Sequence, residues 1–152
     1  MEFLASVHPK VVHFPIAFLM LYPIMELLFL FTTKDFFLKA AMLFLSIGVI
    51  GSLLAVLTGN QAYQSIINWS NEGKEIFYAH QNYANLTVWY FAALLIIRYF
   101  LFIKKKLSWK LNIIIVLLAL AGGYFVYQAG AYGGKLADQV TSSKVLNMEL
   151  EK

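Results

Sequence analysis

The sequence predicts an all-α integral membrane protein, a four-helix bundle with up-down-up-down topology. Of its 152 residues, 61% are hydrophobic and 13% are charged, about half the charged share of a typical soluble domain. Four apolar stretches are each long enough to cross, as a helix, a hydrocarbon core of about 30 Å. Continuous apolar runs such as residues 111–121 lack the alternation of a membrane β-barrel strand. All four crossings are therefore expected to be α-helices.

The expected spans form one transmembrane domain over residues 1–135, and a polar C-terminal tail follows at residues 136–152. The spans are placed at residues 11–31, 36–57, 83–103 and 111–132. The first span is too long for a cleaved signal peptide and contains Pro15, Pro23 and Glu26, so we expect it to be retained. The two hairpins share a general likeness, but no internal repeat is recognised in the sequence.

Two segments outside the spans have a recognisable character. The connection at residues 58–82 contains apolar residues that predict one face of a short interfacial helix, with the tryptophan at headgroup level. These residues are Ala62, Ile66, Ile67 and Trp69. The C-terminal tail is long enough for one short surface helix.

Basic residues near the spans predict the orientation of the bundle. The two short connections are flanked by Lys34, Lys39, Arg98, Lys104, Lys105, Lys106 and Lys110. The opposite side has Lys10, Lys74 and Lys135 near the membrane. Because basic loops stay in the cytoplasm, we expect both termini and residues 58–82 to lie outside a bacterial inner membrane. Nucleic acid is not expected as a partner, since these lysines account for the net charge of +4.

His8, His13 and His80 are the only histidines, and ionisable side chains at membrane depth are candidates for a functional site. In this topology the start of the first span, the end of the second, the start of the third and the end of the fourth share one membrane side. Polar and small residues gather at these places, at residues 8–13, 58–61, 80–82, 122–128 and 130–134. The site is therefore expected at the outer end of the bundle.

His13 and His80 begin parallel spans and are expected to face each other at similar depth. Two imidazoles in that arrangement can bind one haem b iron from opposite faces, with His8 as the alternative ligand to His13. Gly122 and Gly123 would let a flat macrocycle approach the fourth span, because glycine has no side chain. His8 would otherwise be placed to bind a haem propionate or a quinone oxygen.

Several alternatives stay open at this point. Histidines near the headgroups commonly pair with backbone carbonyls or water, and glycines in membrane helices commonly serve close packing. Glu26 and Arg98 lie at equal depth on parallel spans, which favours a structural ion pair over a proton relay. The absence of cysteine excludes disulfides and c-type haem attachment.

Copper, zinc and hydrolytic chemistry find less support in the sequence. The methionines that copper would favour lie well below the histidines, and they are Met20, Met25 and Met42. Zinc would need a further ligand that only Glu72 or Glu75 offers near the histidines. No serine, histidine and acid gather at the outer end, so a hydrolase triad is not expected.

Three stretches of the chain are distinctive. They are His8-Pro9-x-x-Val12-His13-Phe14-Pro15-Ile16-Ala17, then Leu57-Thr58-Gly59 with His80, and finally Gly123-x-x-Val126-Tyr127-x-x-Gly130. Together they resemble bacterial membrane proteins of domain of unknown function 2231, over residues 8–134. The resemblance implies a four-helix membrane protein. It carries over His8, His13, Gly59, His80 and Gly123 as the matching site positions.

Members of that family are often fused to, or found beside, Rieske or c-type cytochrome domains, which implies a respiratory redox setting. This chain has no such domain attached, so its electron partner is expected to be a larger membrane complex or a periplasmic redox protein. The favoured function is a small b-type haem carrier rather than a stand-alone enzyme. The haem would be held by His80 and either His13 or His8, and quinone is a further candidate ligand. The alternative is a cofactor-free structural subunit of a larger membrane complex. A quinone-binding or small-solute transport protein is a third interpretation.

Overall fold

A computed structural model describes the backbone of residues 2–64 and 70–150 and the side chains of residues 6–64 and 70–139. The helices are α1 (Glu2–Val11), α2 (His13–Thr32), α3 (Asp35–Gln64), α4 (Asn71–Ile103) and α5 (Trp109–Leu150). No strand occurs in the described part of the chain. Four helical segments are long and apolar enough to cross a membrane, with α1 and α2 contributing to one of them. The predicted all-α, four-span architecture is confirmed.

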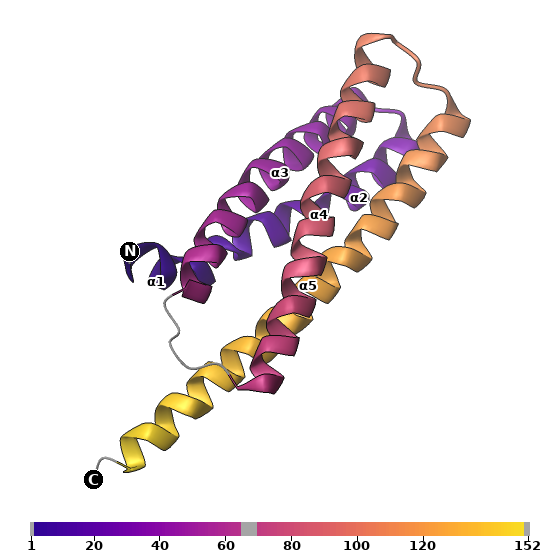
Figure 1. The fold of residues 1–152 in the computed structure, drawn as a ribbon. Helices are drawn as coiled ribbons and strands as arrows, with labels where there is room; N and C mark the ends of the chain where they lie inside the picture. Colours follow the sequence, from indigo (N-terminus) through magenta and orange to yellow (C-terminus); the bar gives the residue numbers. More distant parts are fainter. Residues whose placement is uncertain (1, 65–69, 151–152) are drawn as a thin grey trace.

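The helices α2 to α5 alternate in direction along the bundle (Figure 1). Both α2 and α4 pack against α3 and α5, so the parallel helices α2 and α4 lie diagonally across the bundle. Helix α1 precedes α2 across a break at Val12 and packs against α3. Pro15 favours this break because its missing N–H cannot bond the carbonyl of Val11. The end of the bundle that carries α1, the last turns of α3 and the start of α4 is called the histidine end below.

The helices extend further at the histidine end than the predicted spans do. Helix α3 continues to Gln64, and α4 begins at Asn71, after Ser70 caps it by accepting a 2.9 Å hydrogen bond from the Gly73 backbone N–H. Much of the expected connection at residues 58–82 is therefore helical. Ile66, Ile67 and Trp69, which were expected to line an interfacial helix, lie outside the described residues. The expected tail continues α5 instead of forming a separate surface helix.

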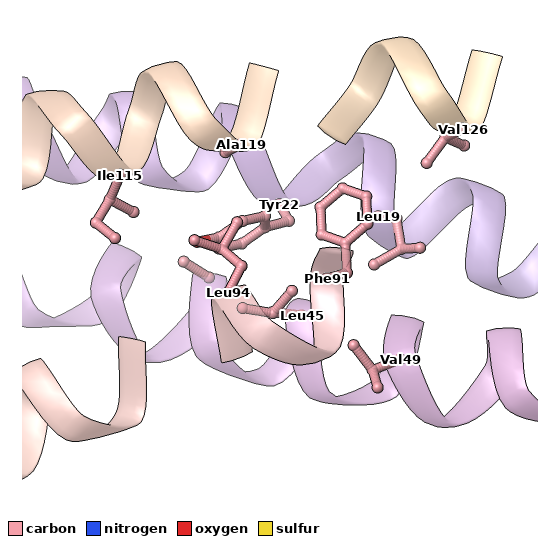
Figure 2. Close-up of a cluster of buried hydrophobic side chains, with 10 residues drawn as sticks. Leu19, Tyr22, Leu45, Val49, Phe91, Leu94, Ile115, Ala119 and Val126 are labelled. Atoms are coloured by element: carbon pink, nitrogen blue, oxygen red, sulfur yellow. The ribbon is translucent and has the colours of Figure 1, made fainter. Parts of the chain in front are cut away.

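The core is built from apolar side chains of all four long helices, as Figure 2 shows. Tyr22 and Phe91 meet at its centre edge to face, with ring centroids 6.2 Å apart. Leu45 and Ile115 pack against them from α3 and α5. Large apolar side chains such as Trp89 point away from the bundle, which suits a surface covered by lipid.

The structure reveals an internal repeat that the sequence analysis did not recognise. Glu26 and Arg98 are 72 residues apart, and the same separation joins His8 to His80. On the first long helix of each hairpin, the buried residues Pro15, Leu19, Tyr22 and Glu26 correspond to the buried residues Thr87, Phe91, Leu94 and Arg98. On the second long helix of each hairpin, equivalent residues are separated by slightly more than 72 residues. The buried residues of α3 and their equivalents in α5 are, in order, Leu38, Ala41, Met42, Leu45, Gly48, Val49 and Ser52, and Asn112, Ile115, Val116, Ala119, Gly122, Gly123 and Val126. The two hairpins therefore bury many equivalent positions, which indicates an approximate pseudo-twofold axis along the bundle.

Equivalent glycines bring the two helices of each hairpin together. A Cβ added at Gly48 would lie 2.5 Å from Cδ2 of Leu19, and one added at Gly122 would lie 2.5 Å from Cζ of Phe91. Leu19 and Phe91 are equivalent positions, so each hairpin closes by the same contact of a large side chain on a glycine. Small residues at helix interfaces allow this close approach in membranes.

Candidate functional site

His8 is held against α3 by the hydroxyl of Thr58. Its Nδ1 lies 2.9 Å from the Thr58 Oγ1. That hydroxyl donates its single proton within α3, where the carbonyls of Leu54 and Ala55 lie 3.1 and 3.0 Å away. The oxygen can therefore only accept from His8, which places the ring proton on Nδ1. The Nε2 atom of His8 is left with a lone pair and no proton.

His80 is held against α5 in the same way, but by a backbone carbonyl. Its Nδ1 lies 2.8 Å from the oxygen of Ala129. A carbonyl oxygen only accepts hydrogen bonds, so the ring proton of His80 is on Nδ1 and its Nε2 has a free lone pair. The His8 ring likewise makes a hydrogen bond with the backbone of Ala55, the position in α3 equivalent to Ala129. His80 is thus oriented by the Ala129 carbonyl, and His8 by the Thr58 hydroxyl with the Ala55 backbone beside it.

The structure brings His8 and His80 together at the histidine end. Both rings are half-buried, and they lie close enough that a positive charge on one repels a charge on the other. They approach from α1 and α4, which make no close backbone contact within the described residues. A hydrogen bond to Nδ1 that leaves Nε2 free is the arrangement that metal-ligating histidines have.

His13, which was expected to face His80, lies on the exposed surface instead. His8 and His13 are five residues apart, which turns their side chains about 140° from each other around a helix of 3.6 residues per turn. One of them faces α3 and the other faces outward. His8, the expected alternative to His13, is thus the histidine of the first hairpin that faces inward at the end of the bundle where His80 lies.

The glycines of the site differ in what lies next to them. A Cβ at Gly59 would be 3.0 Å from the His8 ring, so this glycine accommodates the imidazole. The ring of Phe91 fills the space beside Gly122, where a macrocycle was expected to approach, and Gly122 serves helix packing. Gly123 has only the sulfur of Met20 nearby, at 3.8 Å. A neighbouring open groove of about 300 Å³ is lined by Ile16, Met20, Val126, Tyr127, Gly130 and Ala131.

A second polar cluster lies deeper in the bundle and confirms the predicted ion pair. Arg98 donates from Nη2 to Oε2 of Glu26 at 2.7 Å and from Nη1 to Oδ1 of Asn112 at 3.1 Å. The Glu26 and Arg98 side chains are both fully buried. Arg98 therefore belongs to the core and does not contribute to the basic loop charge that was used to predict orientation.

Two tyrosine rings stack on each other near His80 and Gly133 in the chain. Tyr132, next to Gly133, stacks on Tyr83 with centroids 5.7 Å apart, and the Lys135 ammonium lies 5.1 Å from the Tyr132 ring centroid. Among the described side chains, no group of three or more histidines and acids could hold a metal ion, and Glu72 and Glu75 point to solvent. Within the described part of the chain, the candidate ligands at this end of the bundle are therefore the two imidazoles.

The fold and the site define a small helical membrane protein with a pair of oriented histidines at one end. The chain belongs to a family described as "Predicted membrane protein (DUF2231)", which matches residues 5–143. Comparisons with curated proteins and with solved structures found no match. Membership of this family and the four spans are in agreement with the expectations from the sequence.

Three groups that orient the histidines received no role from the sequence. Thr58 and Gly133 fell within polar or glycine-rich stretches, but nothing distinguished them from their neighbours. Ala129 contributes only a backbone carbonyl, which leaves no trace in residue type. One signal was present: Gly48 precedes Gly59 by the same number of residues as Gly122 precedes Gly133. That equality would have revealed the repeat and the two histidine sites together.

Proposed function

We propose that this chain is a b-type haem carrier in which His8 and His80 supply the two axial ligands. It would transfer electrons between a quinol and a periplasmic acceptor, or within a larger respiratory membrane complex, from the outer face of a bacterial inner membrane. The observation that carries the proposal is the shared state of the two rings. Both have Nδ1 fixed by a hydrogen bond and Nε2 free to ligate.

The set of donors favours haem over a bare metal ion. A zinc ion needs three or four protein ligands, and the described side chains offer no such group. Haem iron needs only two axial ligands from the protein because the porphyrin supplies four nitrogens. When bound, haem would supply one-electron transfer, and two imidazole ligands leave no open position for oxygen.

The residues around the histidines have definite tasks in this proposal. Thr58 and the carbonyl of Ala129 fix the ring orientations and raise the basicity of the free nitrogens. Lys135, above the stacked Tyr132 at the same end, offers positive charge for haem propionates. The apolar groove next to Gly130 offers a surface on which a quinone ring would fit.

The test is a dithionite-reduced minus air-oxidised spectrum of detergent-purified protein from haem-replete cells. We expect sharp alpha and Soret bands, lost in His8→Ala and in His80→Ala. His13→Ala is the matched control, because its side chain is exposed, and it should keep both bands. A flat spectrum of the wild-type protein, or bands unchanged in both ligand variants, would overturn the proposal.

A cofactor-free structural subunit is the second candidate, and a specific observation favours it. Phe91 and the His8 ring already occupy the space beside Gly122 and Gly59, so these glycines serve packing without a ligand. Under this function, His8→Ala and His80→Ala would lower the amount of assembled complex or its thermal stability. No optical signal would change.

A further inference from the structure

The two histidines occupy equivalent positions of the two hairpins, and so do the groups that surround them. A Cβ at Gly59 would lie 3.0 Å from Cε1 of His8, and one at Gly133 would lie 3.3 Å from Cε1 of His80. One turn earlier, each helix presents a carbonyl to the same ring, from Ala55 in α3 and from Ala129 in α5. Each imidazole is therefore enclosed by an Ala-x-x-x-Gly turn of the following helix.

We propose that the Ala55–Gly59 and Ala129–Gly133 turns are two copies of one positioning device that aims both histidines at a single ligand on the pseudo-twofold axis. The inference rests on the proposed function and identifies Gly59 and Gly133 as its positioning residues. At His80 the Ala129 carbonyl accepts the Nδ1–H, at His8 the Thr58 hydroxyl lies at Nδ1, and each glycine leaves room for the ring against the helix. An alanine at Gly59 or Gly133 would bring its Cβ to 3.0 or 3.3 Å from the ring, so the ring would have to shift by a few tenths of an ångström.

The position of the axis is supported independently by the ion pair. Glu26 and Arg98 have the same separation in sequence as the histidines, and they meet at 2.7 Å across the bundle. These two equivalent side chains of the diagonal helices therefore meet between the hairpins. His8 and His80 have the same separation in sequence at the histidine end, where each ring lies against the equivalent glycine of the following helix, Gly59 and Gly133.

The two turns are similar but not identical. Thr58 adds a hydroxyl contact to His8, whereas the equivalent position in α5 is Tyr132, which stacks on Tyr83. Among the described residues, the contacts that hold His80 are the Ala129 carbonyl and Gly133. We expect substitution of Gly133 to affect its histidine more than substitution of Gly59, because His8 retains the Thr58 hydroxyl.

The experiment uses the full chain in two states. Without haem, nitrogen-15 NMR of the histidine rings should show the Nδ1-protonated form for His8 and His80, and ordinary exchange averaging for exposed His13. Gly133→Ala should remove the Nδ1–H hydrogen-bond signature of His80 only. With haem, Gly59→Ala and Gly133→Ala should each weaken haem retention about tenfold or more and alter the electron paramagnetic resonance of the ferric iron. Gly134→Ala is the control, since no atom lies within 4 Å of its added Cβ.

The outcomes separate this inference from the proposed function. If the wild-type protein lacks a Soret band but both rings are fixed at Nδ1, haem binding fails and the paired positioning device stands. If the Soret band is present but neither glycine variant changes the ring signals or the paramagnetic resonance, the positioning device is overturned and the haem proposal stands. Rings of His8 and His80 that average like His13 would also overturn it.

Discussion

The Glu26–Arg98 pair and the His8–His80 pair occupy equivalent places in the two hairpins, yet their chemistry differs. The charged side chains pair directly as donor and acceptor, because Arg98 donates to Glu26 and also to Asn112. Two neutral imidazoles whose Nδ1–H groups already donate elsewhere cannot hydrogen-bond to each other, because both Nε2 atoms are acceptors. The first pair is joined directly by protein groups, although Oε1 of Glu26 and Nε of Arg98 have no hydrogen-bond partner among the described residues. The second has two identical lone pairs that only a proton, a metal or a donor can join.

This difference shows how a repeated hairpin supports two tasks on one axis. Where equivalent residues differ in charge, they fasten the diagonal helices α2 and α4 through the core. Where they remain identical, as His8 and His80 do, they place two like rings at one end of the bundle, which is the site proposed above for a ligand. The structural pair lies deep in the bundle, and the histidine pair lies at one end, where an exchangeable partner or ligand can reach it.

The largest expected effect comes from removing one member of the ion pair. Glu26→Leu and Arg98→Leu should each lower the free energy of unfolding by about 3–5 kcal/mol, because the remaining charge is fully buried without its partner. The double variant should recover most of that loss. Thermal unfolding in detergent, followed by circular dichroism, measures all three. If each single variant were as stable as the double variant, the two charges would not be compensating each other.

A charge exchange sharpens the comparison. The double variant Glu26→Arg with Arg98→Glu should fold, because the two positions are equivalent. Its free energy of unfolding should be about 2 kcal/mol lower, because the hydrogen bond from Arg98 to Asn112 is lost. Adding Leu38→Asn and Asn112→Leu moves that partner to its equivalent position in α3 and should restore the loss. The same unfolding measurement applies. An exchange variant as unstable as Arg98→Leu would show that the two hairpins are not energetically equivalent.

The smallest expected effect concerns the equivalent glycines in the cores of the two hairpins. Gly122→Ala should cost about 1–2 kcal/mol, since its Cβ would meet the rigid, buried Phe91 ring at 2.5 Å. Gly48→Ala should cost a similar amount, because its Cβ would meet both Cδ2 and Cγ of the buried Leu19, at 2.5 and 2.7 Å. Gly123→Ala is the control and should change stability by less than about 0.5 kcal/mol. Equal losses in all three variants would contradict the contacts.

Much of this fold was predictable because membrane helices follow from length and hydropathy alone. The Glu26–Arg98 pair was also predictable, since equal depth and the cost of an unpaired charge leave few partners. The choice between His8 and His13 was not predictable, because it depends on which of the two side chains faces α3, one lying before the break at Val12 and the other after it. The repeat was hidden because equivalent residues had diverged in type, as Leu19 and Phe91 illustrate.

One feature of α5 bears on how any partner would reach the histidines. At 42 residues the helix is about 63 Å long, roughly twice the thickness of a hydrocarbon core. Figure 1 shows its C-terminal part continuing past the other helices at the histidine end. The histidines therefore lie near the base of this projecting helix, and a protein that docks on them must approach alongside it. The projecting part of α5 thus restricts the directions from which a partner can reach the histidines.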